Sequence, residues 1–232
     1  MQSIFGIGIL FFGTPTLIIL GLPFAETLAT VLPASAAISL FQVWQGPCPQ
    51  RDFIRRFGIW CLAPLAIVLV SGLYWGWDLE LNLFVAGILL IYVVIRTSAA
   101  AAQFLKNLID RFPKVLLSII GTVHGLSNLG GGILAVFVSS LYEDKKQVRA
   151  HIAFCYIFFA AIQLAVLVIL VPEVMGWHQL CLATLGGAVF LVTERCLFNS
   201  ISSPLFDKMF TIIIGTYSVL IFVIYLWIMP VW

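Results

Sequence analysis

The residues with the clearest chemistry are glycines and small polar side chains inside a long apolar run at residues 115–141. The run is interrupted by Ser127-Asn128-Leu129-Gly130-Gly131-Gly132. A helix that begins inside a membrane leaves its first backbone N–H groups unpaired and carries a partial positive charge there. Glycine lets a ligand approach that backbone closely. The segment therefore predicts a cradle for a small anion, in which Ser127 and Asn128 add hydrogen-bonding groups.

A related motif lies near the N-terminus, where Gly13-Thr14-Pro15 interrupts the apolar run at residues 3–22. Gly8 and Gly13 have the same spacing as Gly125 and Gly130, and Pro15 then aligns with Gly132. Proline suits the first turn of a helix because its missing N–H would be unpaired there. We expect this motif to form a second tip of the site, with the Thr14 hydroxyl as a donor. Tight packing of small residues between helices is the alternative for both motifs.

Four further polar residues are candidates for the same site: His124, Ser35, Gln42 and Gln163. His124 could pair with an anion when protonated or carry a coupled proton; alternatively, it is neutral and bonded to a carbonyl that the broken helix frees. Gln42 and Gln163 hold equivalent places after the two motifs and could line a cavity, although helix–helix hydrogen bonding is the commoner role. Ser35 follows Pro33 and is a candidate of the same kind.

Other kinds of chemistry lack the residues that they need. No Lys, Arg, Asp or Glu lies in the middle of an apolar run, so dipoles and hydroxyls would have to hold an anion. The HExxH, GxSxG and Walker motifs are absent, which excludes ATP hydrolysis by this chain. The 5 cysteines form no CxxC motif and no cluster with histidine. We therefore predict no catalytic residue, no metal and no cofactor.

These residues must be positioned by helices in a membrane. Hydrophobic residues make up 62% of the 232 and charged residues only 9%, against roughly 25% charged residues in soluble domains. So few charges cannot cover a soluble fold, which excludes a soluble enzyme, a disordered chain and a nucleic-acid binder. Continuous apolar runs long enough to cross ~30 Å of hydrocarbon lie at about residues 24–43, 57–75, 79–95, 149–171, 176–193 and 210–229.

A different pattern occupies residues 97–113, between the two halves. Phe104, Leu105, Leu108, Ile109 and Phe112 share one helical face, and polar residues occupy the other. This pattern predicts a short amphipathic helix in the membrane interface that ends before Pro113. A plain helical linker is the alternative, and the two are compatible.

The order of the runs repeats, because each half has one interrupted segment and three continuous spans. If both interrupted segments are re-entrant hairpins, all 12 Lys and Arg residues fall on one side of the membrane; full crossings by every run would divide them. The positive-inside rule favours the hairpins and places both termini outside. We thus predict an all-α integral membrane protein of two inverted repeats, residues 1–96 and 115–232, each a re-entrant helical hairpin plus three transmembrane helices. Residues 97–114 would be a cytoplasmic amphipathic linker.

The glycine motifs also carry a family resemblance. Gly125-Leu-Ser-Asn-Leu-Gly-Gly-Gly132 resembles the glycine-rich motif of the sulfite exporter TauE/SafE-like family of membrane transporters, and Gly8-Ile-Leu-Phe-Phe-Gly-Thr-Pro-Thr16 resembles its first-half counterpart. The duplicated layout extends the resemblance over nearly the whole chain. It implies movement of sulfur oxyanions, such as sulfite or organosulfonates, across the cytoplasmic membrane. The chain departs from the family where members often carry a first glycine run and this sequence has Gly13-Thr14-Pro15.

The sequence therefore predicts a secondary transporter for a small anion, with sulfite or an organosulfonate as the expected substrate. Alternating access would take place around the two broken-helix tips. A coupled proton or ion would drive it, or the anion would simply flow down its own gradient. The lipid bilayer and a second copy of the chain are the other expected partners. An intramembrane enzyme is one alternative, but a catalytic set is missing. A non-transporting membrane subunit is another, but it gives the paired broken helices no use.

Overall fold

The computed structural model describes residues 9–75, 87–88, 90–91, 93–95, 97–142 and 144–197, together with 212, 215–216, 219–220 and 223. These residues are almost entirely helical and include no β-strand. Many apolar side chains of the helices face outward, among them Ile67 (65% exposed), Ile169 (75%) and Leu185 (61%). Helices with apolar surfaces of this kind require an apolar surrounding, so the chain is an all-α membrane protein.

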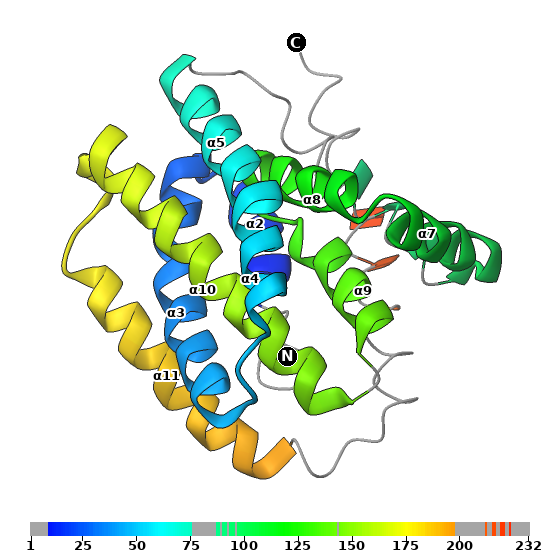
Figure 1. The fold of residues 1–232 in the computed structure, drawn as a ribbon. Coiled ribbons are helices and arrows are strands. Elements are labelled where there is room, and N and C mark those ends of the chain that lie inside the picture. Colours follow the sequence, from blue (N-terminus) through cyan, green and yellow to red (C-terminus); the bar gives the residue numbers. More distant parts are fainter. Residues whose placement is uncertain are drawn as a thin grey trace.

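The described helices follow one another along the chain as Figure 1 colours them. The π-helix η1 (Ile9–Gly13) runs into α2 (Thr14–Ile19), and α3 (Phe24–Gln45) follows. The segments α4 (Arg51–Phe57), the π-helix η2 (Gly58–Leu62) and α5 (Ala63–Trp75) are continuous with one another. The remaining elements are α7 (Ala99–Arg111), α8 (Pro113–Ser127), α9 (Gly131–Leu141), α10 (Lys145–Leu170), the 3-10 helix η3 (Pro172–Val174) and α11 (His178–Leu197).

Three helical segments are long and apolar enough to cross a membrane: Phe24–Gln45, Arg51–Trp75 and Lys146–Leu170. They coincide with three of the continuous spans expected from the sequence. A fourth expected span, at residues 176–193, corresponds to the shorter apolar helix His178–Val192. The expected spans at residues 79–95 and 210–229 lie largely outside the described residues.

The helix α3 lies between α10 and α11 and packs on both of them (Figure 1). Small residues bring the backbones together: a Cβ atom on Gly186 would lie 2.8 Å from the Cβ of Ala34, and one on Gly46 would lie 2.6 Å from the Cβ of Ala150. Gly46 follows the end of α3, whereas Ala150 lies near the start of α10. The helices α3 and α10 therefore run antiparallel, and their middle turns lie side by side.

A second close contact joins α8 to the span formed by η2 and α5. Cβ atoms on Gly121 and Gly125 would collide with the backbone of Cys61 and Leu65, respectively. The missing side chains of these two glycines let one helix approach the other closely, as in the packing alternative given for the motif that contains Gly125. Gly125 therefore has a structural role just before the break between α8 and α9.

The expected amphipathic helix is present as α7, and it ends before Pro113 as expected. Ser98 caps its N-terminus by accepting a hydrogen bond from the Ala101 N–H at 3.3 Å. Its apolar face is divided: Leu105 and Ile109 pack into the core, whereas Phe104 is 68% exposed. The helix thus combines contact with the protein and an apolar side chain free to meet lipid.

The first glycine motif differs from expectation. Gly13 has helical dihedral angles (φ −64°, ψ −44°), and the described chain stays helical from Ile9 to Ile19. The prediction of a break at Gly13-Thr14-Pro15 is therefore wrong for the described residues. Pro15 clashes with a preceding carbonyl in a regular α-helix, and a wider π-turn just before it relieves that clash without breaking the helix. The chain turns only at residues 20–23, where Gly21 has φ 86°.

The boundaries of the helices agree with the alignment of the two motifs. α2 begins at Thr14 and α9 begins at Gly131. These two starts are as far apart in the chain as Gly13 and Gly130. α3 begins at Phe24 and α10 begins at Lys145. These two starts are as far apart in the chain as Gln42 and Gln163. Two pairs of helices therefore start in the register that the sequence comparison gave.

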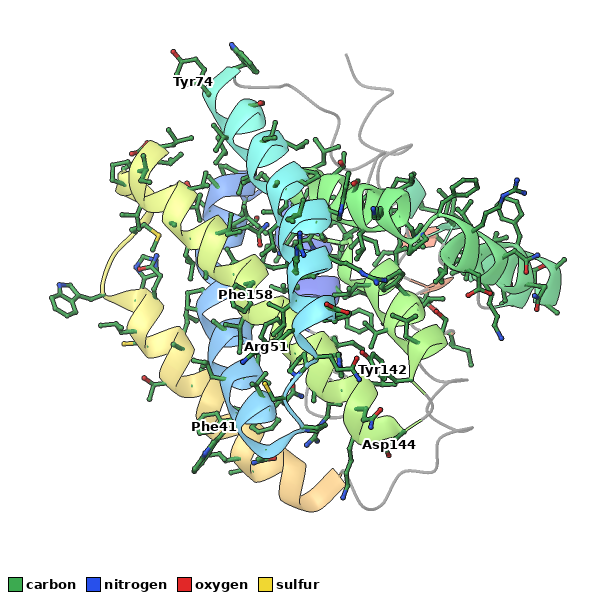
Figure 2. The ribbon with its side chains drawn as sticks, viewed as in Figure 1. Phe41, Arg51, Tyr74, Tyr142, Asp144 and Phe158 are labelled. Atoms are coloured by element: carbon green, nitrogen blue, oxygen red, sulfur yellow. The ribbon has the colours of Figure 1, made fainter. Side chains whose placement is uncertain are left out.

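Basic segments gather at one end of the bundle. Arg51 opens α4, and the contact between Gly46 and Ala150 brings that segment close to the basic start of α10. Figure 2 places Phe41 and Asp144 toward this end and Tyr74 at the opposite end. The chain thus has one end rich in basic residues, while the far end of the second span carries aromatic side chains.

Candidate functional site

The two glycine motifs meet through one buried hydrogen bond. The Asn128 side-chain amide donates from Nδ2 to the Thr14 hydroxyl oxygen at 2.9 Å, and both side chains are buried. Asn128 ends α8, and Thr14 is the first residue of α2. The structure thus brings together segments that are 114 residues apart in the chain. Pro15 is buried next to Thr14, and Gly13 is half-buried.

The second motif is a true break between two helices. Asn128 takes a left-handed conformation (φ 61°) and its N–H donates to the His124 carbonyl at 2.8 Å. The Ser127 hydroxyl donates to the Val123 carbonyl at 2.8 Å and accepts from the Leu129 N–H at 3.3 Å. These bonds satisfy the end of α8. The expected break at residues 127–132 is therefore present, and α9 starts from it.

The start of α9 offers donors. The Gly132 N–H donates to the Leu129 carbonyl at 3.3 Å. Within the described part of the chain, no hydrogen bond is seen for the N–H groups of Gly130 and Gly131. The three glycines are buried. Unpaired N–H groups at a helix N-terminus attract anions, and the helix dipole adds to that attraction.

Neighbouring residues explain why glycine is needed here. A Cβ on Gly130 would lie 2.7 Å from the His124 Cβ, and one on Gly131 would overlap the Tyr156 hydroxyl. Tyr156, which is 1% exposed, was not among the residues predicted from the sequence. A signal for it existed, because Ser35 and Tyr156 have the same separation as Gln42 and Gln163.

His124 lies on the last turn of α8 and is fully buried. Its ring stacks on Phe159 of α10 with centroids 4.0 Å apart, and it meets Tyr156 edge-on at 6.1 Å. The Gln163 amide approaches the ring, yet neither side chain makes a hydrogen bond of good geometry. Tyr156, Phe159 and Gln163 share one face of α10 because they are three and seven residues apart.

The other polar candidates are placed as follows. Ser35 is buried in α3, one turn after Val31, whose side chain contacts Gly13. It therefore shares the face of α3 that packs on the first motif. Gln42 is buried two turns further along α3, close to the level of Ala150, because Gly46 packs there. Gly46 lies about 6 Å beyond Gln42 along α3, and Gln163 lies about 20 Å beyond Ala150 along α10. The two glutamines are therefore roughly 14 Å apart along these antiparallel helices at 1.5 Å per residue. The structure thus separates Gln42 from His124 and Gln163.

A comparison with models of protein families shows to which family the chain belongs. The model of the sulfite exporter TauE/SafE family matches residues 1–223. The chain belongs to the sulfite exporter TauE/SafE family. The match covers both glycine motifs and all the described helices, and it confirms the resemblance seen in residues 125–132. Comparisons with curated proteins and with solved structures gave no match.

TauE/SafE proteins are membrane transporters of sulfur anions, so this chain is a membrane transporter of that broad class. Membership in a transporter family also fits the prediction that the chain is not an enzyme. The buried polar residues of the described part include no Lys, Arg, Asp or Glu. In this TauE/SafE chain, any anion at the break would meet amides, hydroxyls, an imidazole and a helix N-terminus.

Proposed function

We propose that this TauE/SafE chain is a secondary transporter for sulfite or an organosulfonate, and that the substrate binds at the break between α8 and α9. Both substrates present several equivalent oxygen atoms with delocalised negative charge. Backbone N–H groups at a helix N-terminus suit such oxygens, since several donors converge on one point. The hydrogen bond between Asn128 and Thr14 is the observation that carries the proposal, because it joins both motifs at one buried place.

The donors would be the N–H groups of Gly130 and Gly131 and the amide of Asn128. Oδ1 of Asn128 has no hydrogen-bond partner among the described residues, whereas Nδ2 donates to Thr14. The two amide orientations differ little in shape. After a flip, the Thr14 hydroxyl would donate to Oδ1 and Nδ2 would face the anion. The amide can therefore turn a donor toward an arriving ligand while it keeps its bond to Thr14.

The architecture that we propose for transport has two inverted repeats, residues 1–96 and 115–232, joined by a cytoplasmic linker at residues 97–114. The equal register of α2 with α9, and of α3 with α10, supports this division. The apolar runs at residues 3–22 and 115–141 would both be re-entrant, and both termini would face outward. The basic end of the bundle would face the cytoplasm across the cell membrane.

Alternating access would move the two repeats relative to each other about the contact between Thr14 and Asn128. The start of α9 lies at this contact and the Thr14 hydroxyl reaches it from α2, so a ligand bound there would touch both repeats. Ser127 and Gly132 hold the shape of the second tip, and Pro15 and Gly13 hold that of the first. Ser35 would support the first tip from α3, as Tyr156 does the second from α10.

Transport of labelled sulfite and methanesulfonate into liposomes that contain the purified protein tests the proposal. Asn128→Ala should weaken binding by about 0.5–1.5 kcal/mol, or roughly two- to tenfold, because a neutral hydrogen bond is lost. Asn107→Ala is the matched control, since Asn107 pairs with Gln103 on the exposed side of α7. Absence of transport of either anion by the wild type, or equal effects of the two substitutions, would refute the proposed site.

A further inference from the structure

Both ring nitrogens of His124 are buried and lack a hydrogen-bond partner among the described residues. A neutral imidazole has one donor and one acceptor nitrogen, so both capacities are unused. The ring lies one helical turn before the break, and Gly130 packs directly on its Cβ. Buried polar atoms are nearly always paired, so unused ones beside an anion cradle point to a group that arrives from outside.

The groups that face His124 carry no charge at neutral pH. Tyr156 and Gln163 approach it from α10. Cys155 of α10 and Cys61 of η2 are buried in the same core. No titratable side chain occurs in η1, α2 or α9, and α5 contributes only a tyrosine at its exposed end. The charged side chains of α7 and the lysine of α8 are exposed. Among the residues that the structure describes, His124 is therefore the group nearest the break that can become positive.

An anion entering this buried, uncharged place would be unfavourable without a compensating charge. A proton on His124 supplies that charge and gives the ring two N–H donors. One N–H can donate to an oxygen of the anion. The other can donate to Oε1 of Gln163, an atom that has no hydrogen-bond partner among the described residues. Protonation would thus pair both ring nitrogens and the Gln163 amide oxygen in one step.

We propose that His124 takes up one proton together with each substrate anion and releases both on the other side, so that the chain works as an electroneutral anion–proton symporter. This inference rests on the proposed function. The proton comes from water on the side where the anion loads and adds to the free lone pair of the imidazole. It returns to water when the anion leaves, because the uncompensated imidazolium is then buried in apolar surroundings. No bond other than N–H is made or broken.

A second buried histidine provides a matched control. His151 stands on α10, but its Nδ1 lies 2.7 Å from the Gln147 carbonyl oxygen, and its ring stacks on Tyr142. It lies five residues, or roughly 7.5 Å along α10, before Tyr156, which packs on the break. We therefore expect His151→Gln to keep the coupling that His124→Gln removes.

Methanesulfonate is the best probe, because it is a fully ionised anion and cannot itself carry a proton at neutral pH. Calorimetry on the wild type in two non-sulfonate buffers of different ionisation enthalpy should show uptake of about one proton per bound anion. In liposomes, a pH gradient should drive accumulation of about tenfold per pH unit, the ratio for one proton per anion. His124→Gln should abolish proton uptake and gradient-driven accumulation, and His151→Gln should leave both unchanged.

The outcomes separate the two proposals. If methanesulfonate neither binds nor moves, the proposed function fails. If it binds and moves without proton uptake in the wild type, or if His124→Gln keeps the proton uptake, only the role of His124 is overturned. If His124→Gln binds no methanesulfonate, Gln163→Leu tests the role of His124 instead. That change removes the amide oxygen that would accept from the protonated imidazole, so it must lower the proton uptake per bound anion. Unchanged uptake in that variant would contradict the pairing proposed here.

Discussion

The two glycine motifs occupy the same place in the register of the helices but differ in their backbones. At residues 13–15 a π-helix passes into an α-helix without interruption. At residues 127–132, α8 ends with a left-handed Asn128, and α9 begins with two glycines. Only the second arrangement starts a new helix from a turn, and its first N–H groups show no hydrogen-bond partner among the described residues.

Glycine alone does not break a helix. Gly13 keeps helical angles, because the helix continues on both sides of it. The second motif breaks because Asn128 tolerates φ 61° and the Ser127 hydroxyl accepts the next free N–H. We infer that the second motif binds the substrate, whereas the first supplies the Thr14 hydroxyl and supports the Asn128 amide.

The strongest test of this difference is an added methyl group. Gly131→Ala should reduce transport at least tenfold and lower the free energy of unfolding by about 1–3 kcal/mol, because its Cβ would overlap the Tyr156 hydroxyl. Gly13→Ala should do less, since its Cβ would lie 3.0 Å from one methyl of Val31, a side chain that can shift. Thermal unfolding in detergent and transport in liposomes measure the two effects.

Gly58 offers a control for this comparison. It has helical angles, and a Cβ there would have no neighbour within 4 Å. Gly58→Ala should therefore be neutral in both assays. Partial recovery of Gly131→Ala by Tyr156→Phe would confirm the cause, since that change removes the closest atom. Equal losses for Gly13→Ala and Gly131→Ala would show that the motifs do not differ in the way described.

The second test separates support from binding. Thr14→Val removes the acceptor of the Asn128 amide and should lower stability by about 1–3 kcal/mol, because a buried donor is left unpaired. The substrate affinity should fall only about two- to threefold, since the donors at Gly130 and Gly131 remain. Asn128→Ala should show the larger loss of affinity. Titrations of anion binding measure the loss of affinity, and unfolding curves measure the loss of stability. A larger loss of affinity for Thr14→Val than for Asn128→Ala would assign the ligand to the first motif.

Much of the fold could be predicted from the sequence, because apolar run length and motif spacing depend on local residue types. The starts of α2 and α9 follow the glycine alignment, and those of α3 and α10 follow the two glutamines. The continuity through Gly13 could not be predicted, since it depends on how a π-turn accommodates Pro15. The packing of Gly125 on the Leu65 backbone also depends on which helices become neighbours.

The grouping of the candidate-site residues could be predicted in part for the same reason. Thr14, Asn128 and the glycines are local features of the motifs, and they do come together. Tyr156 and Phe159 come from α10, and only the packing of that helix against the break brings them to His124. Gln42 and Gln163 appeared equivalent by position, but the antiparallel contact of α3 with α10 sets them at different levels.

The smallest expected effect comes from Pro15→Ala. The new N–H can restore a regular α-helical hydrogen bond, so the π-turn before it should tighten. Thr14 keeps its bond to Asn128, and the second motif is untouched. We therefore expect stability to change by no more than about 1 kcal/mol and the apparent KM for methanesulfonate to change by less than about threefold. Unfolding curves and initial transport rates measure both quantities. Since Pro15 aligns with Gly132, a loss as large as that of Gly131→Ala would mean that the first motif also contacts the substrate, and the assignment of binding to the second motif alone would be wrong.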